Sequence, residues 1–285
     1  MSLAESKVLR IRHVTGFSYL GNAESSYNEA RMTPQQSPHQ SVVEATLAIT
    51  PVAVQSTYRD YFDTIVTTFD LHEPHERLEV VAEATVHTFV DARDGHDVTV
   101  KSLREPRAVE RFAEFLAPTT RTSMAPEVLE DLRSSTGDGA DVHATARDVV
   151  ARVQDHVDYV RGSTQVSSTA QEVWEQGAGV CQDLTHVTIS MLRSLGIPAR
   201  YVSGYFHSNP DATVGEEILG ESHAWVEYFA DGWSGIDPTN ASSIGTNHVI
   251  VAKGREYGDV PPLKGIYHGG PSSALGVVVH ITRVA

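Results

Sequence analysis

The sequence of 285 residues predicts an α+β protein in which a β-sandwich-like part precedes a part that combines helices with strands. Three observations support this class. Apolar and polar residues alternate through much of the first hundred residues, which is the period of a half-buried strand. After Pro106, apolar residues recur every three or four positions, which is the period of a helix. Strand-like runs then return in the last third of the chain.

The first part contains candidate strands and no helical pattern of its own. The runs are 8–17, 43–50, 61–71 and 78–86. The run 43–50 ends at Pro51, since proline cannot donate a ladder hydrogen bond. Short strands separated by turn residues predict a β-rich N-terminal domain over residues 1–103. Residues 104–285 form the predicted second domain, with its core at about 140–260 and a C-terminal tail strand.

Helices follow in the second part. Apolar residues line one face of residues 142–157, and Asp141 precedes that run as a helix cap. A short helix is expected at 169–176. A third helix carries Cys181 in its first turn and ends at Gly196 and Pro198, where left-handed geometry and a missing donor stop it. Strands are then expected at 199–206, 222–229 and 233–236, the last two joined by an Ala-Asp-Gly turn.

Composition and motif content argue against several classes of partner and cofactor. The formal net charge of −15, without a concentrated basic patch, argues against nucleic acid or an anionic membrane as a partner. We find neither a membrane-spanning apolar run nor a signal peptide, which predicts a cytoplasmic protein. No phosphate-cradling, calcium or zinc-protease motif is present, so no metal and no organic cofactor are expected. The lone Cys181 cannot form an internal disulfide, and it is either a buried small residue or a reactive thiol.

The position of Cys181 favours a reactive thiol. The free N–H groups and positive dipole at a helix start stabilise a thiolate, which is the nucleophilic form. His223 lies in one predicted strand, and Asp237 ends the next. A hairpin would bring these two together, as a thiol–imidazole–carboxylate relay requires. A buried apolar cysteine is the competing interpretation.

Four motifs in order, GVCQDLTHV, LRSLGIPARYVSGY, HAWVEY and GWSGIDPTN, resemble the bacterial transglutaminase-like proteins. The segments YNEARMTP and HERLEV resemble the β-rich domain that precedes the core in this family, and GREYGDVPPLKGIYHG is similar to its closing segment. The resemblance implies a papain-like, transglutaminase-like core in which a helix-borne cysteine packs on an antiparallel sheet. It also implies that Cys181 is the nucleophile, His223 the general base and then acid, and Asp237 the orienting carboxylate. The implied reaction is acyl transfer through a thioester, from an amide of a peptide, a glutamine side chain or an isopeptide.

Other residues are candidates around this relay. The Cys181 N–H is the expected first oxyanion donor, and Tyr159 is a candidate second donor whose competing interpretation is a core aromatic. Gly179, Gln182 and Trp225 are candidate substrate-cleft residues; Trp225 is equally expected as a packing aromatic. Asp183 and His186 are expected to be structural, as a helix cap and a hydrogen-bonded core histidine.

Three functions remain open at this level. The first is hydrolysis of a peptide or protein substrate by a cysteine protease or amidase. The second is a cross-linking transglutaminase, which excludes water from the acyl-enzyme. The third is a peptide- or protein-binding module that keeps the fold without turnover. The sequence specifies neither the substrate nor the oligomeric state.

Overall fold

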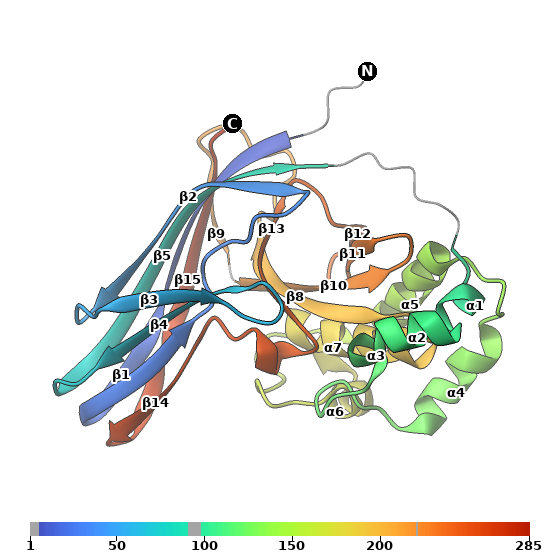
Figure 1. The fold of residues 1–285 in the computed structure, drawn as a ribbon, viewed down its shortest axis with the longest axis horizontal. Helices are drawn as coiled ribbons and strands as arrows, with labels where there is room; N and C mark the ends of the chain where they lie inside the picture. Colours follow the sequence, from blue (N-terminus) through green and yellow to red (C-terminus); the bar gives the residue numbers. More distant parts are fainter. Residues whose placement is uncertain (1–5, 91–97, 221) are drawn as a thin grey trace.

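The computed structural model describes residues 6–90, 98–220 and 222–285. It contains a large antiparallel sheet and a five-stranded antiparallel sheet, and the smaller sheet lies between the large one and the helices (Figure 1). The predicted α+β class is confirmed. No helix in these ranges is long and apolar enough to cross a membrane.

The large sheet is one curled sheet of eight strands: β1 (Ser6–Ala30), β2 (Gln40–Thr50), β3 (Gln55–Arg59), β4 (Ile65–Leu71), β5 (His75–Phe89), β9 (Glu217–Gly220), β14 (Leu263–Gly269) and β15 (Ser272–Arg283). The long strand β1 organises it. Its first half pairs with β5 and β15, and its second half pairs with β4 and β14. The alternating burial along β5 explains why its period was visible in the sequence.

Two details of this sheet differ from the prediction. The strand expected at 61–71 begins only at Ile65, because residues 60–64 form a turn. In that turn the Asp60 carboxylate accepts the N–H groups of Phe62 at 2.9 Å and Thr64 at 3.0 Å. The tail expected in the second domain also lies elsewhere: β14 and β15 both pair with β1. Strand pairing therefore crosses the predicted boundary between residues 103 and 104.

Seven α-helices occur in the described residues: α1 (Val100–Leu103), α2 (Pro106–Arg111), α3 (Ala113–Leu116), α4 (Pro126–Ser135), α5 (Val142–His156), α6 (Ala170–Gln176) and α7 (Cys181–Ser194). The predicted cap of α5 is confirmed, because Asp141 accepts the Ala144 N–H at 2.7 Å. Helix α7 ends before Gly196, whose φ of 82° is left-handed. A 3₁₀ turn, η1 (Tyr257–Asp259), follows later in the chain.

The small sheet has the order β12-β11-β10-β8-β13. Its strands are β8 (Ala199–Phe206), β10 (Ser222–Phe229), β11 (Trp233–Asp237), β12 (Ser242–Ser243) and β13 (His248–Gly254). The predicted hairpin is confirmed by β10 and β11, which pair antiparallel. A separate parallel pair joins β6 (Asp158–Tyr159) to β7 (Ala178–Gly179). One hydrophobic core links α5 and α7 to both sheets, including Leu9, Val187, Leu192, Val226 and Ile281.

Candidate active site

Asp237 lies at the end of β11, and its carboxylate is fully buried. Its Oδ1 atom accepts the N–H groups of Thr239 at 2.8 Å and Asn240 at 3.2 Å, so the turn after β11 holds one oxygen. Its Oδ2 atom accepts from His223 Nε2 at 2.7 Å and from the Asn240 side-chain amide at 2.8 Å. Burial alone would raise the pKa of Asp237, but hydrogen bonds from His223, His248 and Asn240 hold that pKa well below its usual range.

His223 is the second residue of β10, and the β10–β11 hairpin places it beside Asp237. Its side chain is 11% exposed. Burial would lower the pKa of His223, yet hydrogen bonds to Asp237 and to the Cys181 thiol outweigh burial and raise that pKa to about 9. Since Nε2 contacts Asp237, Nδ1 is the ring nitrogen left for the thiol. The structure therefore brings Cys181, His223 and Asp237 together in the predicted order.

Cys181 is the first residue of α7 and is half-buried. Asp183 fixes this helix start, because its Oδ2 atom accepts the Val180 N–H at 2.9 Å and the Thr164 hydroxyl at 2.5 Å. The Thr185 hydroxyl donates to the Cys181 carbonyl at 2.7 Å. Asp183 thus caps the helix, as expected from its place in the first turn. A thiol held at this position meets the positive end of the α7 dipole.

Two of the predicted cleft residues have packing roles instead. Trp225 has no exposed surface and packs with Val202 and Ile250, so it does not wall an open cleft. Gly179 is also buried, and a Cβ atom there would lie 2.8 Å from the Asp183 Cβ. Close packing against Asp183 therefore explains glycine at position 179 without a substrate contact.

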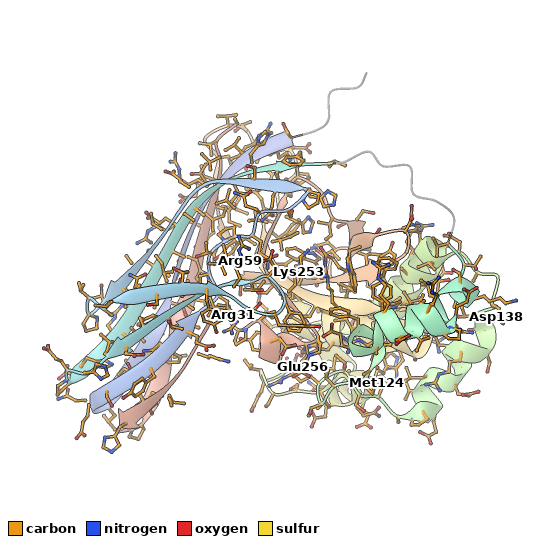
Figure 2. The ribbon with its side chains drawn as sticks, in the orientation of Figure 1. Arg31, Arg59, Met124, Asp138, Lys253 and Glu256 are labelled. Carbon is orange, nitrogen blue, oxygen red and sulfur yellow. The ribbon has the colours of Figure 1, made fainter. Side chains whose placement is uncertain are left out.

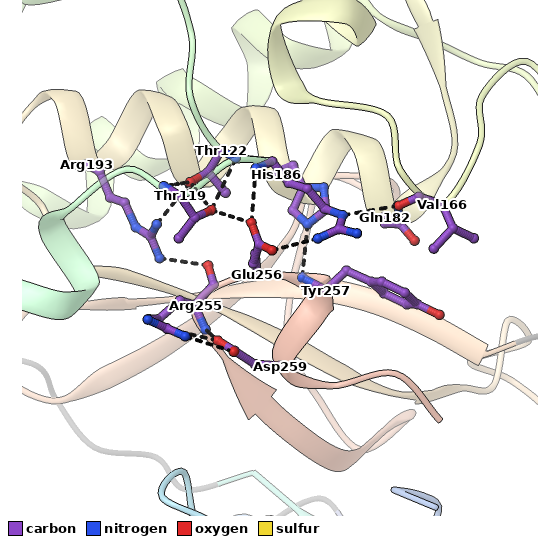
Figure 3. Close-up of polar contacts among 11 residues, drawn as sticks. Thr119, Thr122, Val166, Gln182, His186, Arg193, Arg255, Glu256, Tyr257 and Asp259 are labelled. Carbon is purple, nitrogen blue, oxygen red and sulfur yellow. Dashed lines mark hydrogen bonds and ion pairs between the residues drawn. The ribbon is translucent and has the colours of Figure 1, made fainter. Parts of the chain in front are cut away.

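Gln182 follows the nucleophile in α7, and Tyr159 pairs with the short strand that precedes this helix. The Gln182 side-chain amide donates to the Val166 carbonyl at 3.1 Å, which joins the helix start to the 163–168 loop (Figure 3). Tyr159 pairs with Gly179 in the β6–β7 ladder, and its side chain is 44% exposed. That exposure contradicts the core-aromatic interpretation of Tyr159. Its role as an oxyanion donor remains a prediction.

Sequence reasoning missed Asn240 and His248. The Nδ1 atom of His248 accepts the Gly245 N–H at 3.3 Å, so Nε2 carries the proton and donates to Asp237 Oδ2 at 3.4 Å. Asn240 could have been found, since it ends the GIDPTN motif and a residue three positions after an aspartate commonly closes a turn. His248 had no such signal, because the pairing of β13 with β8 brings it back to Asp237.

His223, Asp237 and His248 form the one group in the described ranges whose ligand atoms lie close enough together, within 4.8 Å, to hold a metal ion. The Oδ2 atom of Asp237 already accepts the Asn240 amide and the His223 ring. N–H donors that point at Asp237 Oδ2 disfavour a cation at that oxygen. The hydrogen bonds to Asp237 explain why the three side chains lie together without a metal ion.

A second polar network fastens η1 to α7 (Figure 3). His186 is fully buried, and its Nε2 atom accepts the Tyr257 N–H at 3.1 Å, which confirms it as a hydrogen-bonded core histidine. The Glu256 carboxylate accepts the Arg121 guanidinium at 2.7 Å, and Arg121 also donates to the Val166 carbonyl at 3.2 Å. Arg121 thereby connects the 163–168 loop, which contacts Gln182, to Glu256, the residue that precedes η1.

Comparison with known proteins covers both parts of the chain. Residues 9–87 match the bacterial transglutaminase-like N-terminal region, and residues 130–238 match the transglutaminase-like superfamily. An uncharacterized protein of Mycobacterium leprae is 40% identical over 280 residues, covering 97% of this chain and 99% of the relative. An uncharacterized protein of Mycobacterium tuberculosis is 30% identical over 292 residues, covering 95% and 91%.

The fold has a solved counterpart, described as a "Putative Cysteine Protease from Cytophaga hutchinsonii". It superposes with a TM-score of 0.79 at 20% identity, and the match covers 99% of this chain and 92% of that one. The likeness in architecture therefore includes the large sheet as well as the surroundings of Cys181.

Proposed function

This chain belongs to the transglutaminase-like superfamily, and on that premise we propose that Cys181, His223 and Asp237 are the catalytic triad of a thiol enzyme acting on amides. One observation carries the proposal: the His223 ring is hydrogen-bonded to Asp237 at 2.7 Å, and the Cys181 thiol is the other group whose proximity raises the pKa of that ring. A histidine that merely packed in the core would not need both partners.

The chemistry follows from these contacts. His223 Nδ1 takes the proton of the Cys181 thiol, and the sulfur attacks the amide carbonyl carbon. The carbon–nitrogen bond breaks as the His223 imidazolium gives its proton to the departing amine, which leaves a thioester on Cys181. Water, or a second amine, then gives a proton to His223 and attacks the thioester carbonyl. The carbon–sulfur bond breaks, the acyl group is released, and the departing sulfur takes the proton back from His223, which restores the thiol. Asp237 holds the His223 ring in one tautomer throughout.

The raised pKa of His223 suits the acid half of this cycle. With a pKa of about 9, the imidazole retains at neutral pH the proton that it takes from the Cys181 thiol, and it can donate that proton to the leaving amine. The N–H groups of Asp183 and Leu184 donate to the Val180 carbonyl, so the first-turn N–H groups of Cys181 and Gln182 are the ones proposed to receive the developing oxyanion. Tyr159, exposed beside Gly179, is the proposed second donor.

A thiol-alkylating probe tests the triad directly. We expect Cys181 to be labelled in the folded protein at neutral pH, and we expect His223→Gln to slow that labelling by about tenfold or more. His268→Gln is the matched control, since His268 is exposed and its ring is hydrogen-bonded to Glu24 on the large sheet. An unlabelled Cys181, or equal labelling of the His223→Gln and wild-type proteins, would contradict the catalytic assignment. Tight peptide binding by a protein with an unreactive thiol would instead indicate a binding module.

The fate of the thioester is a separate question. We propose hydrolysis as the main outcome, which agrees with the cysteine-protease description of the Cytophaga hutchinsonii structure. Incubation of a glutamine-containing protein with a fluorescent primary amine separates the two outcomes. Release of ammonia or a peptide without amine incorporation supports hydrolysis, and covalent attachment of the amine supports transfer.

A further inference from the structure

Three strands of the large sheet each place a buried polar side chain against the His248 segment, which we define as residues 246–250. These side chains are Lys7 of β1, Gln40 of β2 and Thr88 of β5, which are 6%, 2% and 1% exposed. The three strands are neighbours in the sheet. Their contacts therefore reach the residues on both sides of His248 from one rigid surface.

Gln40 binds Ile250, at the end of this segment, through both its N–H and its carbonyl group, as the backbone of a neighbouring strand would. Its Oε1 atom accepts the Ile250 N–H at 2.7 Å, and its Nε2 atom donates to the Ile250 carbonyl at 2.8 Å. The pairing of β13 with β8 shifts register between Ile250 and Ala252. A register shift leaves local backbone groups less completely paired, and the Gln40 amide compensates for this at Ile250.

Lys7 and Thr88 hold the other end. The Lys7 ammonium donates to the Asn247 side-chain oxygen at 2.8 Å and to the Pro210 carbonyl at 2.6 Å. The Thr88 hydroxyl donates to the Thr246 carbonyl at 2.6 Å. The buried bonds of Thr88 and Gln40 hold the backbone at Thr246 and Ile250, on either side of His248, because a displaced partner would leave a buried polar group unpaired. The partly buried Lys7 contact holds the Asn247 side chain.

The position of His248 depends on that backbone. Its ring packs on Phe206 at 4.5 Å between centroids and donates to Asp237 Oδ2, the oxygen that also receives His223. A displacement of the His248 segment would therefore change the contacts of the Asp237 carboxylate.

We infer that the large sheet orients the Asp237 carboxylate through His248, and that Lys7, Gln40 and Thr88 are positioning residues of the proposed triad. This inference rests on the proposed function and deepens it. The large sheet then does more than cover the core, since it holds the residue that supports the carboxylate behind His223. The competing role is that these residues only hold the two sheets together. The two roles differ in whether the effect of removing a contact on Cys181 reactivity depends on His248.

Two isosteric substitutions separate these roles. Thr88→Val removes the hydrogen bond to Thr246. Thr64→Val is the matched control: Thr64 is also fully buried, and its hydroxyl accepts the N–H of Lys253 (labelled in Figure 2) and the Gln35 side-chain amide, with no contact to residues 246–250 among its hydrogen bonds. We expect Thr88→Val to slow alkylation of Cys181 by about tenfold and Thr64→Val by less than about twofold. Thr88→Ser should restore the wild-type rate.

A double-mutant cycle tests the path through His248. In a His248→Phe background, Thr88→Val should slow alkylation by less than about twofold further, because the link to Asp237 is already absent. Equal effects of Thr88→Val and Thr64→Val, or a full tenfold effect of Thr88→Val in that background, would overturn the inference. If Thr88→Val does not fold, Gln40→Met takes its place in the same cycle.

The NMR titration of the His223 imidazole gives a readout independent of thiol reactivity. We expect its midpoint to be lower in Thr88→Val than in wild type and unchanged in Thr64→Val, since a misplaced carboxylate stabilises the imidazolium less. An unchanged midpoint in Thr88→Val would refute the positioning role. An unreactive wild-type Cys181 together with a shifted midpoint would refute the proposed function while leaving the link from Thr88 to His223 in place.

Discussion

His248 and His223 donate to the same carboxylate oxygen, Oδ2 of Asp237, at 3.4 Å and 2.7 Å. The two histidines differ in charge for a physical reason. Burial lowers the pKa of His248 despite its contact with Asp237, whereas the additional contact with Cys181 helps to raise that of His223 to about 9. One ring is therefore a neutral support, and the other is the ring that exchanges protons.

His248→Phe should slow alkylation of Cys181 by about tenfold while the protein stays folded. Phenylalanine keeps the packing on Phe206 and Trp225 but cannot donate to Asp237. His248→Gln, which retains an N–H donor, should recover part of the rate. Circular dichroism checks the fold, and the second-order rate of alkylation checks the effect. Identical rates for the two variants would show that the donor is irrelevant.

Stability should fall as the pH rises through the pKa of His223. Its folded pKa of about 9 lies above the ordinary value of 6.5, so the folded state binds this proton more tightly. The contribution is fully present below pH 6.5 and is lost as the pH rises towards 9, up to about 3 kcal/mol shared with Asp237. Urea unfolding of wild type and His223→Gln between pH 6 and 10 measures the difference. A difference that does not shrink with pH would contradict the assignment.

Gly179→Ala should destabilise the protein by about 1–3 kcal/mol through overpacking. A Cβ atom at this position would meet the Cβ of Asp183 at 2.8 Å, at the start of the helix that carries Cys181. Gly137→Ala is the control, since nothing lies within 4 Å of a Cβ atom there. Thermal unfolding should separate the two variants, and equal melting temperatures would count against a packing role for Gly179.

Arg193→Met should cost about 3 kcal/mol or more of unfolding free energy. The Arg193 guanidinium is buried and donates to the carbonyls of Ala117 and Ala199 and to that of Arg255, the last of which Figure 3 shows. These carbonyls would lose the arginine as a partner. Arg152→Met removes only an exposed ion pair with Asp131 and should cost less than about 1 kcal/mol. Urea unfolding compares them. A small loss for Arg193→Met would mean that other groups or water satisfy these carbonyls.

Local signals were sufficient where an element's neighbours in sequence decide its structure. Asp141 caps α5 and Gly196 ends α7 because the hydrogen bonds concerned span only a few residues. Strand β3 had no such signal: all five of its residues are exposed, so no alternation of apolar and polar residues marks it. For Gly179 the sequence predicted a cleft position, and for Trp225 it left a cleft wall and a packing aromatic open, because burial depends on neighbours that the sequence does not order in space.

The sequence by itself determined the composition of the proposed triad: one cysteine at a helix start, and a histidine and an aspartate on a hairpin whose strands are adjacent in the chain. Only the tertiary structure decided what surrounds it. His248 reaches Asp237 through the pairing of β13 with β8, and Lys7, Gln40 and Thr88 reach the His248 segment from strands near the start of the chain. Local periodicity carries no information about such long-range contacts, which exist because burying both sheets in one core forces their polar groups to find partners.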